Sequence, residues 1–470
     1  MPARWLAALL LAPGMTCGFT ESQVVAWMDE FDVPGVSIAL VEDGAFTRQM
    51  VLGVANAETG EALTAEHRFQ VASISKPVAA FAVHRLAVDA EIDLEEPIQR
   101  YVQRWTLPGD PAQLPGVTVG RVLSHTAGLT LGGYPGFPEA ADLPGLEESL
   151  SGATNGAGDV RLEDSPGEGF RYSGGGYTLL QLMLEEVTRE AFEDVARALV
   201  FAPLGMSRST FEPDQVAPLA RGHDRFGNPI DNYRFTARAA AGLHTTALDL
   251  VRFELALMSG AYPAISRAMS EPVLTRSGER ITGMGLLNIN GLVGHSGSNF
   301  GWKADMWWHG ADGIVVLTNS ESGREVGELV MCAFTSFRGI AQMDEHCEAV
   351  RSQHGLFRAV YLVSLGVAMF AVFGLILTLV RRRLSLNPGG AARSVSGWLL
   401  VVLGLVAASV LFTSFLPSAV AGMNVPLSTL NLLPHHLAKA APWLVLALIC
   451  GGLSLLSRHR ATLSAQPEEE

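Results

Sequence analysis

Runs of residues with the composition of β-strands lie near both ends of the first three quarters of this chain. The early runs span residues 35–41 and 50–55, and the late ones span residues 291–295, 304–309 and 314–318. Turn residues separate neighbouring runs at 42–44 and 310–313. Between the two groups, helical patterns such as the one at residues 191–199 alternate with loops rich in Gly and Pro. We therefore predict an α/β fold of the α+β type, in which one antiparallel sheet unites both ends around an inserted helical lobe.

The last quarter of the chain is strongly apolar, whereas the acidic residues and most glycines lie before it. Three uncharged stretches, at residues 360–380, 398–420 and 440–457, have about the length that spans a bilayer. Arginine clusters follow the first and third stretches, at residues 381–383 and 458–460. The positive-inside rule places both clusters in the cytoplasm, so we predict that three transmembrane helices follow the folded domain. Buried core helices are the alternative.

The N-terminus predicts a secretory signal peptide, with Arg4 before an apolar stretch and small residues near Gly18. A frayed N-terminal helix is the alternative. The predicted organisation is a signal peptide at 1–18, a folded domain at 19–340, a linker at 341–358, a membrane anchor at 359–460 and a cytoplasmic tail at 461–470. This order puts the folded domain on the outer side of the membrane.

Charge and cysteine content limit the possible partners. The net charge of −14 argues against a nucleic-acid partner. Cys332 and Cys347 fall in the predicted exported part, where a disulfide is possible and two free thiols are an open alternative. No spacing of Cys and His indicates a metal site, and we predict no cofactor. The sequence leaves the oligomeric state open.

Only three of the 33 basic residues are lysines, and Lys76 stands three positions after Ser73 at the start of an apolar helical pattern. Arg keeps its proton in proteins, whereas a desolvated Lys can lose it and act as a base. Positions three apart lie on one face of a helix, and a helix start favours negative charge on the serine oxygen. The pair is a candidate nucleophile and activator. A capping serine beside a solvated lysine is the alternative.

Three further motifs follow in the chain. They are Tyr172-Ser173 in a glycine-rich segment, Leu-Ser-His-Thr-Ala-Gly-Leu around His125, and His295-Ser296-Gly297 at the end of a predicted strand. With Ser-x-x-Lys, Tyr-Ser and His-Ser-Gly in this order, the chain resembles the serine β-lactamase-related hydrolases. The likeness is greatest to the class C group, with its D-alanyl-D-alanine carboxypeptidases and esterases. It covers roughly residues 20–335.

The resemblance implies a β-lactamase/transpeptidase-like fold and an acyl-serine mechanism. Ser73 would attack a carbonyl group, Lys76 would help to deprotonate Ser73, and Tyr172 would act as base and then protonate the leaving group. His295 stands where many relatives have Lys, and it would polarise the substrate or Tyr172. An ordinary packed tyrosine and a hydrogen-bonded strand histidine are the alternatives for these two residues. His125 is expected to be structural.

The resemblance also implies an oxyanion hole and shows one departure. The backbone N–H groups of Ser73 and Ser298 would form the hole, with Ser296 and Gly297 on the same substrate-binding strand. The departure is Gly174, because the family often has Asn at this place in a Tyr-x-Asn motif. That amide commonly contacts the substrate, so the substitution argues against efficient β-lactam hydrolysis and affects peptidase or esterase chemistry less.

We therefore expect a serine hydrolase anchored in a bacterial inner membrane, with its catalytic domain on the periplasmic side. Its small-molecule or peptide substrate would carry an amide or ester bond, as in a D-amino-acid peptide, an N-acyl-D-amino-acid cap or an ester. The combination of a hydrolase domain and three spans resembles periplasmic prodrug-activating peptidases. The alternatives are a ligand-binding sensor or penicillin-binding protein with little turnover, and a degenerate enzyme with a structural role.

Overall fold

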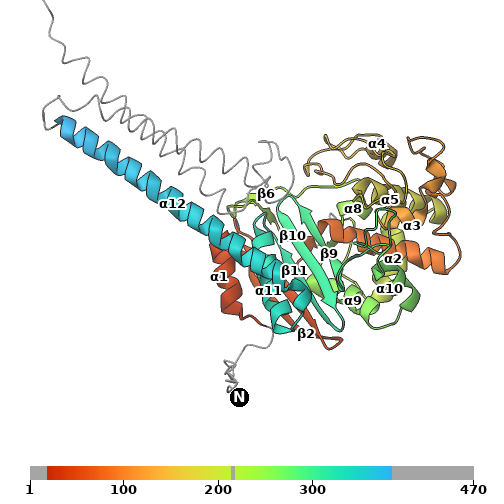
Figure 1. Ribbon diagram of the computed structural model, residues 1–470, viewed down its shortest axis with the longest axis horizontal. Coiled ribbons are helices and arrows are strands. Elements are labelled where there is room, and N and C mark those ends of the chain that lie inside the picture. The colour runs from red at the N-terminus through yellow and green to blue at the C-terminus, as the bar shows by residue number, and fades with distance from the viewer. Residues whose placement is uncertain (1–17, 213–217, 384–470) are drawn as a thin grey trace, which may run out of the picture. The chain divides into compact units, whose positions relative to one another are not determined.

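Figure 1 presents the computed structural model, which describes residues 18–212 and 218–383. The chain divides into two compact units, Met1–Cys347 and Glu348–Glu470. The first unit contains the sheet and the helical lobe, and every candidate site residue belongs to it.

A seven-stranded antiparallel sheet forms the middle of the first unit, in the order β3-β2-β1-β11-β10-β9-β8. The strands are β1 Gly35–Glu42, β2 Ala45–Asn56, β3 Glu61–Ala62, β8 Leu287–Ile289, β9 Leu292–Asn299, β10 Trp302–His309 and β11 Asp312–Thr318. The early strand β1 pairs directly with the late strand β11, so that Ile38 lies opposite Val316. The prediction that both ends of the domain build one antiparallel sheet is confirmed.

Tight turns join neighbouring strands where the sequence predicted them. Between β1 and β2, Asp43 and Gly44 have φ angles of 53° and 78°. Two successive positive φ angles are typical of a type I′ turn, whose twist matches that of the flanking strands. The second turn joins β10 to β11 through Gly310, whose φ angle is 60°. The residues of these two turns therefore help to set the register of both hairpins.

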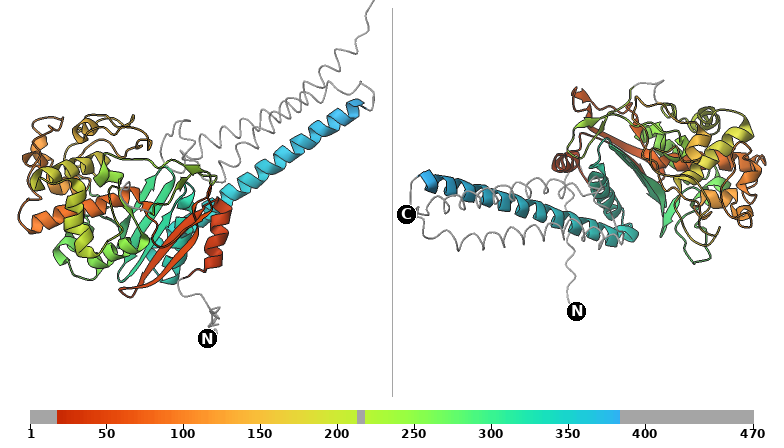
Figure 2. Two further views of the ribbon diagram at one scale, coloured as in Figure 1. Left: turned by 180° about the vertical axis from the view of Figure 1, so that it is seen from behind. Right: turned by 90° about the horizontal axis from the view of Figure 1, so that it is seen from above.

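Helices cover both faces of the sheet (Figure 1, Figure 2). On one face, Val36, Ile38 and Leu40 of β1 share a buried cluster with α1 (Glu21–Phe31) and α11 (Gly323–Phe337). On the other face, the alternate residues Ala39 and Val41 join the core of the helical lobe. Because strand side chains alternate between faces, a strand covered on both sides reads as a continuous apolar run, as β1 does.

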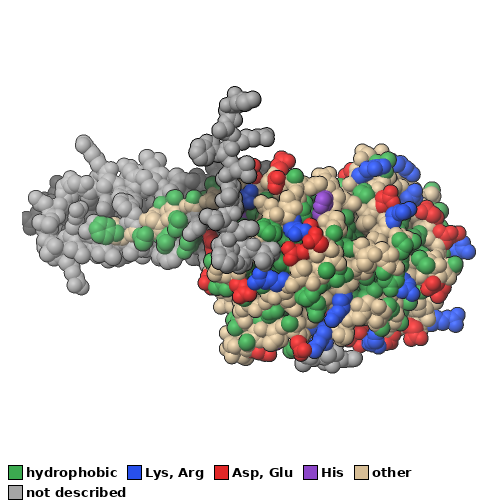
Figure 3. All heavy atoms as spheres, turned by 90° about the horizontal axis from the view of Figure 1, so that it is seen from below, with side chains coloured by type: hydrophobic (Ala, Val, Ile, Leu, Met, Phe, Trp, Pro, Cys, Tyr) green, Lys and Arg blue, Asp and Glu red, His purple; other side chains and the backbone are tan. Residues whose placement is uncertain are grey.

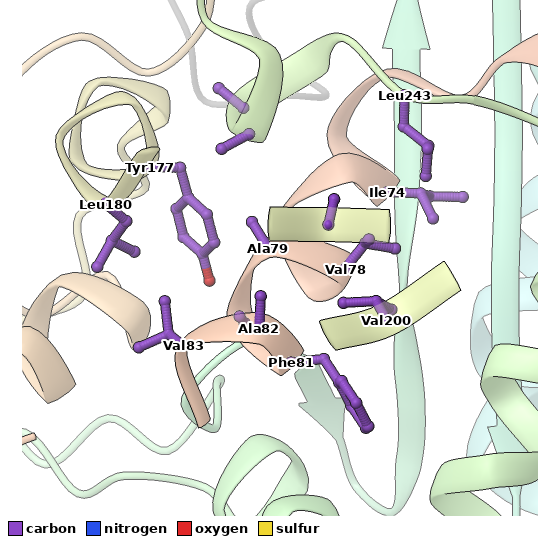
Figure 4. Close-up of a cluster of buried hydrophobic side chains, with 14 of the residues drawn as sticks. Ile74, Val78, Ala79, Phe81, Ala82, Val83, Tyr177, Leu180, Val200 and Leu243 are labelled. Carbon is purple, nitrogen blue, oxygen red and sulfur yellow. The ribbon is translucent and has the colours of Figure 1, made fainter. Parts of the chain in front are cut away.

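The helical lobe is organised around α2 (Ser75–Val88), which is buried along most of its length. It packs against α5 (Gly174–Thr188) and α8 (Arg238–Ala241). Figure 4 shows Val78, Phe81 and their neighbours on α2 among buried side chains, with Tyr177 of α5 beside them. Full burial of a side chain such as Phe81 stabilises the fold by about 1.5–3 kcal/mol. The N-terminus of α2 therefore rests on a rigid support.

The remaining elements are shorter or peripheral. They are α3 Val119–Leu123, α4 Leu146–Leu150, α6 Phe192–Ala196, α7 Ala202–Leu204, α9 Ala247–Met258, α10 Pro263–Ser270 and α12 Asp344–Arg383, with the strand pairs β4 Phe69–Gln70 with β7 His244–Thr245 and β5 Gly222–His223 with β6 Pro229–Ile230. The helix expected at 191–199 is divided, because α6 continues as a wider π-helical turn at Arg197–Phe201.

Acidic and basic side chains are interspersed over the face of the molecule in Figure 3. Exposed ion pairs such as Arg171 with Asp164, at 2.6 Å, connect neighbouring loops. Exposed pairs of this kind contribute about 0–1 kcal/mol each, so the buried core and not the surface charge stabilises the fold.

Cys332 of α11 and Cys347 of α12 form a disulfide, with 2.09 Å between the sulfur atoms and 5.4 Å between the Cα atoms. The alternative of two free thiols is therefore wrong. Both cysteines belong to the first of the two units.

In the part of the chain that the structure describes, no helix is long and apolar enough to cross a bilayer. The first predicted span falls in α12, and the second and third lie outside the described residues, as does nearly all of the predicted signal peptide. The three transmembrane helices thus lack support from the structure, and the anchor and the domain boundaries remain predictions.

Candidate active site

Ser73 lies in a short 3₁₀ turn, Ala72–Ile74, that leads directly into α2. The α-helix itself begins at Ser75, so Lys76 belongs to its first turn. Lys76 Nζ lies 3.0 Å from Ser73 Oγ and donates a hydrogen bond to the carbonyl oxygen of Ala240 at 2.7 Å. Because Lys76 is only 2% exposed, its amine is withdrawn from bulk water. The structure brings the predicted nucleophile and its activator within hydrogen-bond distance.

Ser75 stabilises the 3₁₀ turn that contains Ser73. Its Oγ donates to the carbonyl oxygen of Ala72 at 2.5 Å and accepts from the backbone N–H of Leu243 at 2.9 Å. Ala72 has a φ angle of 47°, a left-handed conformation that costs a residue with a side chain about 1–2 kcal/mol. Such strain persists where surrounding bonds hold it, and Ser75 supplies two of them. Sequence reasoning missed this structural role of the second serine in the motif.

Tyr172 and His295 complete the cluster around Ser73. The ring centroid of Tyr172 is 4.9 Å from Lys76 Nζ, and the Tyr172 hydroxyl is 3.5 Å from His295 Nε2. Tyr172 comes from the loop before α5, and His295 comes from β9. The four predicted catalytic residues are therefore neighbours in the structure, although they come from segments far apart in the sequence.

His295 is a neutral ring in this site. Burial, followed by the charge of Lys76, lowers the pKa of His295 to about 3, against an opposing hydrogen bond with Ser296. Nδ1 lies 2.6 Å from the carbonyl oxygen of Ser296, and a carbonyl can only accept, so Nδ1 carries the proton. The lone pair of Nε2 then faces the hydroxyl of Tyr172. His295 can accept a hydrogen bond from Tyr172, but unlike the lysine of many relatives it supplies no positive charge at neutral pH.

Strand β9 lies directly against the nucleophile turn. A Cβ atom at Gly297 would lie 2.0 Å from the carbonyl oxygen of Val71 and 3.2 Å from the backbone nitrogen of Ser73. Only glycine fits this approach, which gives a physical reason for the glycine in the His-Ser-Gly motif. The predicted oxyanion donors, the N–H groups of Ser73 and Ser298, are next to this contact in the chain.

The hydroxyl groups of Ser296 and Ser298 are bonded to side chains of β10. Ser296 Oγ donates to Asp305 at 2.5 Å, and Ser298 Oγ accepts from Lys303 Nζ at 2.8 Å. Lys303 also forms an ion pair with Glu321 at 3.2 Å. The proton of the Ser296 hydroxyl is therefore held by Asp305, whereas acceptance from Lys303 leaves the Ser298 hydroxyl able to donate its own proton. Sequence reasoning missed Lys303, although the scarcity of lysine that marked Lys76 applies to it equally.

Gly174 occupies the place of the asparagine that is frequent in the family. A Cβ atom at Gly174 would lie 3.0 Å from the carbonyl oxygen of Gly132. An asparagine there would require the loop around Gly132 to move. Lys76 has its second polar partner in the carbonyl group of Ala240 instead.

The end of β9 is tied to the segment before the nucleophile. Asn299 donates to Gln70 Oε1 at 3.2 Å and to the carbonyl oxygen of Ala241 at 3.1 Å. These bonds hold β9, the nucleophile turn and the α8 segment together. Among the residues that the structure describes, no group of three or more His, Cys, Asp and Glu side chains is arranged to hold a metal ion.

The fold and this arrangement are matched by a known family. The family model described as Beta-lactamase matches residues 21–329. The chain therefore belongs to the β-lactamase family, whose fold was predicted from its motifs.

Relatives in this family include binding proteins and an esterase. The chain is 26% identical to "Penicillin-binding protein 4" of Amycolatopsis lactamdurans over 261 residues, which are 52% of this chain and 66% of the relative. It is 25% identical to "Penicillin-binding protein 4*" of Bacillus subtilis over 340 residues, or 63% and 70% of the two chains. It is 27% identical to "Esterase EstB" of Burkholderia gladioli over 193 residues, or 39% and 49%. The matches thus cover between about half and 70% of each relative.

Solved structures share the fold. The octameric penicillin-binding protein homologue from Pyrococcus abyssi aligns with a TM-score of 0.56 and 27% identity, covering 68% of this chain and 76% of that chain. The D-amino acid amidase from Ochrobactrum anthropi SV3, complexed with L-phenylalanine amide, aligns with a TM-score of 0.55 and 22% identity, covering 67% and 99%. At that identity the second comparison speaks for the fold alone.

Proposed function

We propose that the protein is a serine hydrolase that cleaves an amide or ester bond through an acyl-enzyme on Ser73. One observation carries the proposal, namely the 3.0 Å separation of Ser73 Oγ and Lys76 Nζ in a buried setting. The hydroxyl of Tyr172 adds a second group that can exchange protons in the same cluster. Nucleophile, base and orienting group in mutual reach are the signature of covalent catalysis.

Acylation begins when Ser73 Oγ attacks the carbonyl carbon and its proton passes to Lys76 Nζ, once that amine has released its own proton. The carbonyl electrons move to oxygen, where the N–H groups of Ser73 and Ser298 stabilise them by about 3 kcal/mol for each donor. The bond to the leaving group then breaks, and Tyr172 protonates the departing amine or alkoxide while Lys76 restores the phenol proton. General acid–base catalysis of this kind accelerates a step by about 10²–10⁴-fold.

Deacylation reverses these proton movements with water as the nucleophile. Water attacks the acyl carbon and gives its proton to the Lys76–Tyr172 pair, which returns it to Ser73 Oγ as the acid departs. His295 keeps the Tyr172 hydroxyl oriented, because its Nε2 atom accepts from that hydroxyl. A fixed orientation of this hydroxyl matters, since misplaced groups lose much of their catalytic effect.

The neutral imidazole of His295 narrows the proposed substrate class. His295 supplies no positive charge for a substrate carboxylate, which favours an ester or a capped amide over a peptide with a free terminal carboxylate. An N-acyl-D-amino-acid cap, a D-amino-acid amide and a simple ester all meet this requirement. The esterase among the similar proteins supports an ester bond within this range.

The location that we propose is the periplasmic side of a bacterial inner membrane. The disulfide between Cys332 and Cys347 supports an oxidising compartment. The uncharged stretch at 360–380 and the arginines that follow it support an anchor. Large apolar side chains such as Val363 and Met369, 65% and 61% exposed, are compatible with lipid contact.

Protease treatment of spheroplasts tests the location, since a domain that resists digestion until the cells are lysed contradicts it.

Labelling with an active-site probe tests the chemistry. A fluorophosphonate or a fluorescent penicillin should modify Ser73, and mass spectrometry of the digested protein locates the label. Ser73→Ala should abolish both labelling and turnover, while the matched variant Ser207→Ala, at an exposed serine, should retain them. Labelling elsewhere, or full turnover by Ser73→Ala, contradicts the proposal.

A penicillin-binding protein with little turnover is the second candidate, and Gly174 favours it because the amide of the usual asparagine is missing. The two candidates differ in the deacylation rate. A label from fluorescent penicillin that persists for hours, together with absent ester hydrolysis, indicates the binding protein. Rapid release of the acyl group indicates the hydrolase.

A further inference from the structure

His125 holds the backbone on both sides of Tyr172. Its carbonyl oxygen accepts from the N–H of Arg171 at 2.8 Å, and its Nδ1 atom accepts from the N–H of Ser173 at 3.0 Å. One residue therefore satisfies both N–H groups that flank the tyrosine. Ser173 in turn caps α5 by accepting from the N–H of Gly176 at 2.8 Å, which fixes the far end of this segment.

The ring of His125 also lies against the ring of Tyr172. The two centroids are 4.3 Å apart with an angle of 35° between the planes. Tyr177 and Phe170 surround the same imidazole at 5.1 Å and 5.9 Å. The ring of Tyr172 therefore has contacts with His125 and with Lys76 Nζ, which lies 4.9 Å from its centroid.

The protonation and backbone of His125 suit this arrangement. Burial, followed by the charge of Lys76, holds the pKa of His125 well below its usual range, so the ring is neutral. Nδ1 accepts a backbone N–H, and the single proton is therefore on Nε2. The φ angle of 55° is left-handed, a region in which His, Asn and Asp are enriched among residues with a side chain.

We propose that His125 is a positioning residue for Tyr172, which keeps the phenol beside Lys76 by holding its flanking backbone and its ring. The inference rests on the proposed function. His125 acts through Tyr172 and not on the substrate. Loss of its contacts therefore lowers kcat by displacing the phenol and leaves KM nearly unchanged. A displacement of about 1 Å in a catalytic group can cost about 100-fold in rate.

Two substitutions separate the contacts of His125. His125→Phe keeps an aromatic ring beside Tyr172 but removes the acceptor for the N–H of Ser173. His125→Asn places an amide oxygen near the position of Nδ1 and tolerates the left-handed backbone, but it removes the ring. Each is made in the natural chain and in the Tyr172→Phe variant. The readouts are kcat and KM for p-nitrophenyl acetate and the rate of fluorophosphonate labelling at Ser73.

A double-mutant cycle decides between positioning and general structural damage. In the natural chain we expect kcat to fall by about 100-fold for His125→Phe and by about 10-fold for His125→Asn, with KM within about threefold. In the Tyr172→Phe background, each substitution should cost less than about twofold, because the group that it positions is already inactive. Equal losses in both backgrounds, unchanged kcat, or a loss that appears mainly in KM overturn the proposal.

Controls keep this test independent of folding and of the proposed function. Urea unfolding shows which variants retain a cooperative transition, and if His125→Phe does not fold, the cycle with His125→Asn decides alone. If the natural chain neither labels at Ser73 nor hydrolyses the ester, the proposed function fails. If the natural chain is active but the cycle shows no coupling to Tyr172, only the role of His125 fails.

Discussion

Two serine–lysine pairs each include a serine predicted for the site, and they differ in what else each lysine contacts. Lys76 is buried at the start of α2, and its described partners are uncharged oxygen atoms of Ser73 and Ala240. Lys303 lies on β10, where it contacts Ser298 and forms an ion pair with Glu321. An ion-paired lysine has its charge compensated and serves as an anchor. A desolvated lysine with uncharged partners can take part in proton transfer. The same residue type therefore has two roles that the partners distinguish.

The largest expected contrast comes from exchanging each lysine for arginine. Lys76→Arg should lower kcat for an ester by about 1,000-fold, because arginine cannot release its proton to act as a base. Lys303→Arg should remain within about threefold of the natural chain, since a guanidinium retains the ion pair with Glu321. Steady-state kinetics measure both. Comparable losses in the two variants would mean that Lys303 is more than an anchor.

The two tyrosines near Lys76 give the next contrast. Tyr172→Phe should lower kcat by about 100-fold with little change in unfolding free energy, because in the proposed mechanism its hydroxyl takes part in proton transfer. Tyr177→Phe should keep the activity but lose about 1 kcal/mol of stability, since the buried Tyr177 hydroxyl donates to the carbonyl oxygen of Leu123 at 2.9 Å. Kinetics and urea unfolding of both variants measure the two effects. The contrast fails if Tyr177→Phe loses as much activity as Tyr172→Phe.

His295 responds to the charge of Lys76, so its titration distinguishes the two lysines. We expect the pKa of His295, about 3 in the natural chain, to rise in Lys76→Met and to stay unchanged in Lys303→Met. Titration of the His295 ring signal by NMR measures this difference. An unchanged value in Lys76→Met contradicts the assignment of Lys76 as the charge that acts on this ring.

The same low pKa of His295 makes stability depend on pH. Below about pH 6.5 the unfolded chain binds a proton at this histidine, whereas the folded chain does not until about pH 3. The unfolding free energy should therefore fall as pH decreases through this window, by at most about 1.4 kcal/mol per pH unit from this group. His84, His125 and His223 act in the same direction, whereas buried carboxyl groups with a raised pKa, Glu254 foremost, act in the opposite direction. The contribution of His295 is therefore the difference in slope between the natural chain and His295→Asn. Urea unfolding at pH 7 and pH 5 measures it.

The smallest effect is expected from breaking the ion pair of the anchoring lysine. Glu321→Gln keeps an acceptor for the N–H of Gly301 but removes the charge beside Lys303. With both side chains largely buried, we expect a loss of about 1 kcal/mol in stability and about threefold in kcat. A loss of kcat as large as that for Lys76→Arg would remove the distinction between the pairs.

Much of the fold could be predicted because its signals are local. The apolar runs of β1 and β11 predicted two strands, and the presence of such runs near both ends of the domain predicted a common sheet. The turn at residues 43–44 could be predicted because two positive φ angles favour residues such as Asp and Gly. Residues 191–199 were predicted as one α-helix, but the α-helix ends at Ala196 and a π-helical turn follows it. Local periodicity carries no information on such a turn.

The residues of the candidate site could be predicted from the sequence. Their protonation states and the hydrogen bonds that hold them in place could not. Ser73, Lys76, Tyr172 and His295 were chosen from motifs, and the structure brings them together. The bond of Ser75 to Leu243 could not be foreseen, because its partner is distant in the chain and carries no motif. Nor could the partner of Ser298, which is set by the pairing of β9 with β10.

The sequence by itself determined that Ser73 and Lys76 are neighbours, because three residues make almost one helical turn and no distant contact is needed. Only the tertiary structure decided that Tyr172 and His295 meet them and that the histidine is neutral. Ionisation depends on burial and on the charges nearby, and both arise when strands and helices from distant segments pack together. The motifs therefore indicate the proposed acyl-serine chemistry, and the packing of the lobe against the sheet brings together the groups that it requires.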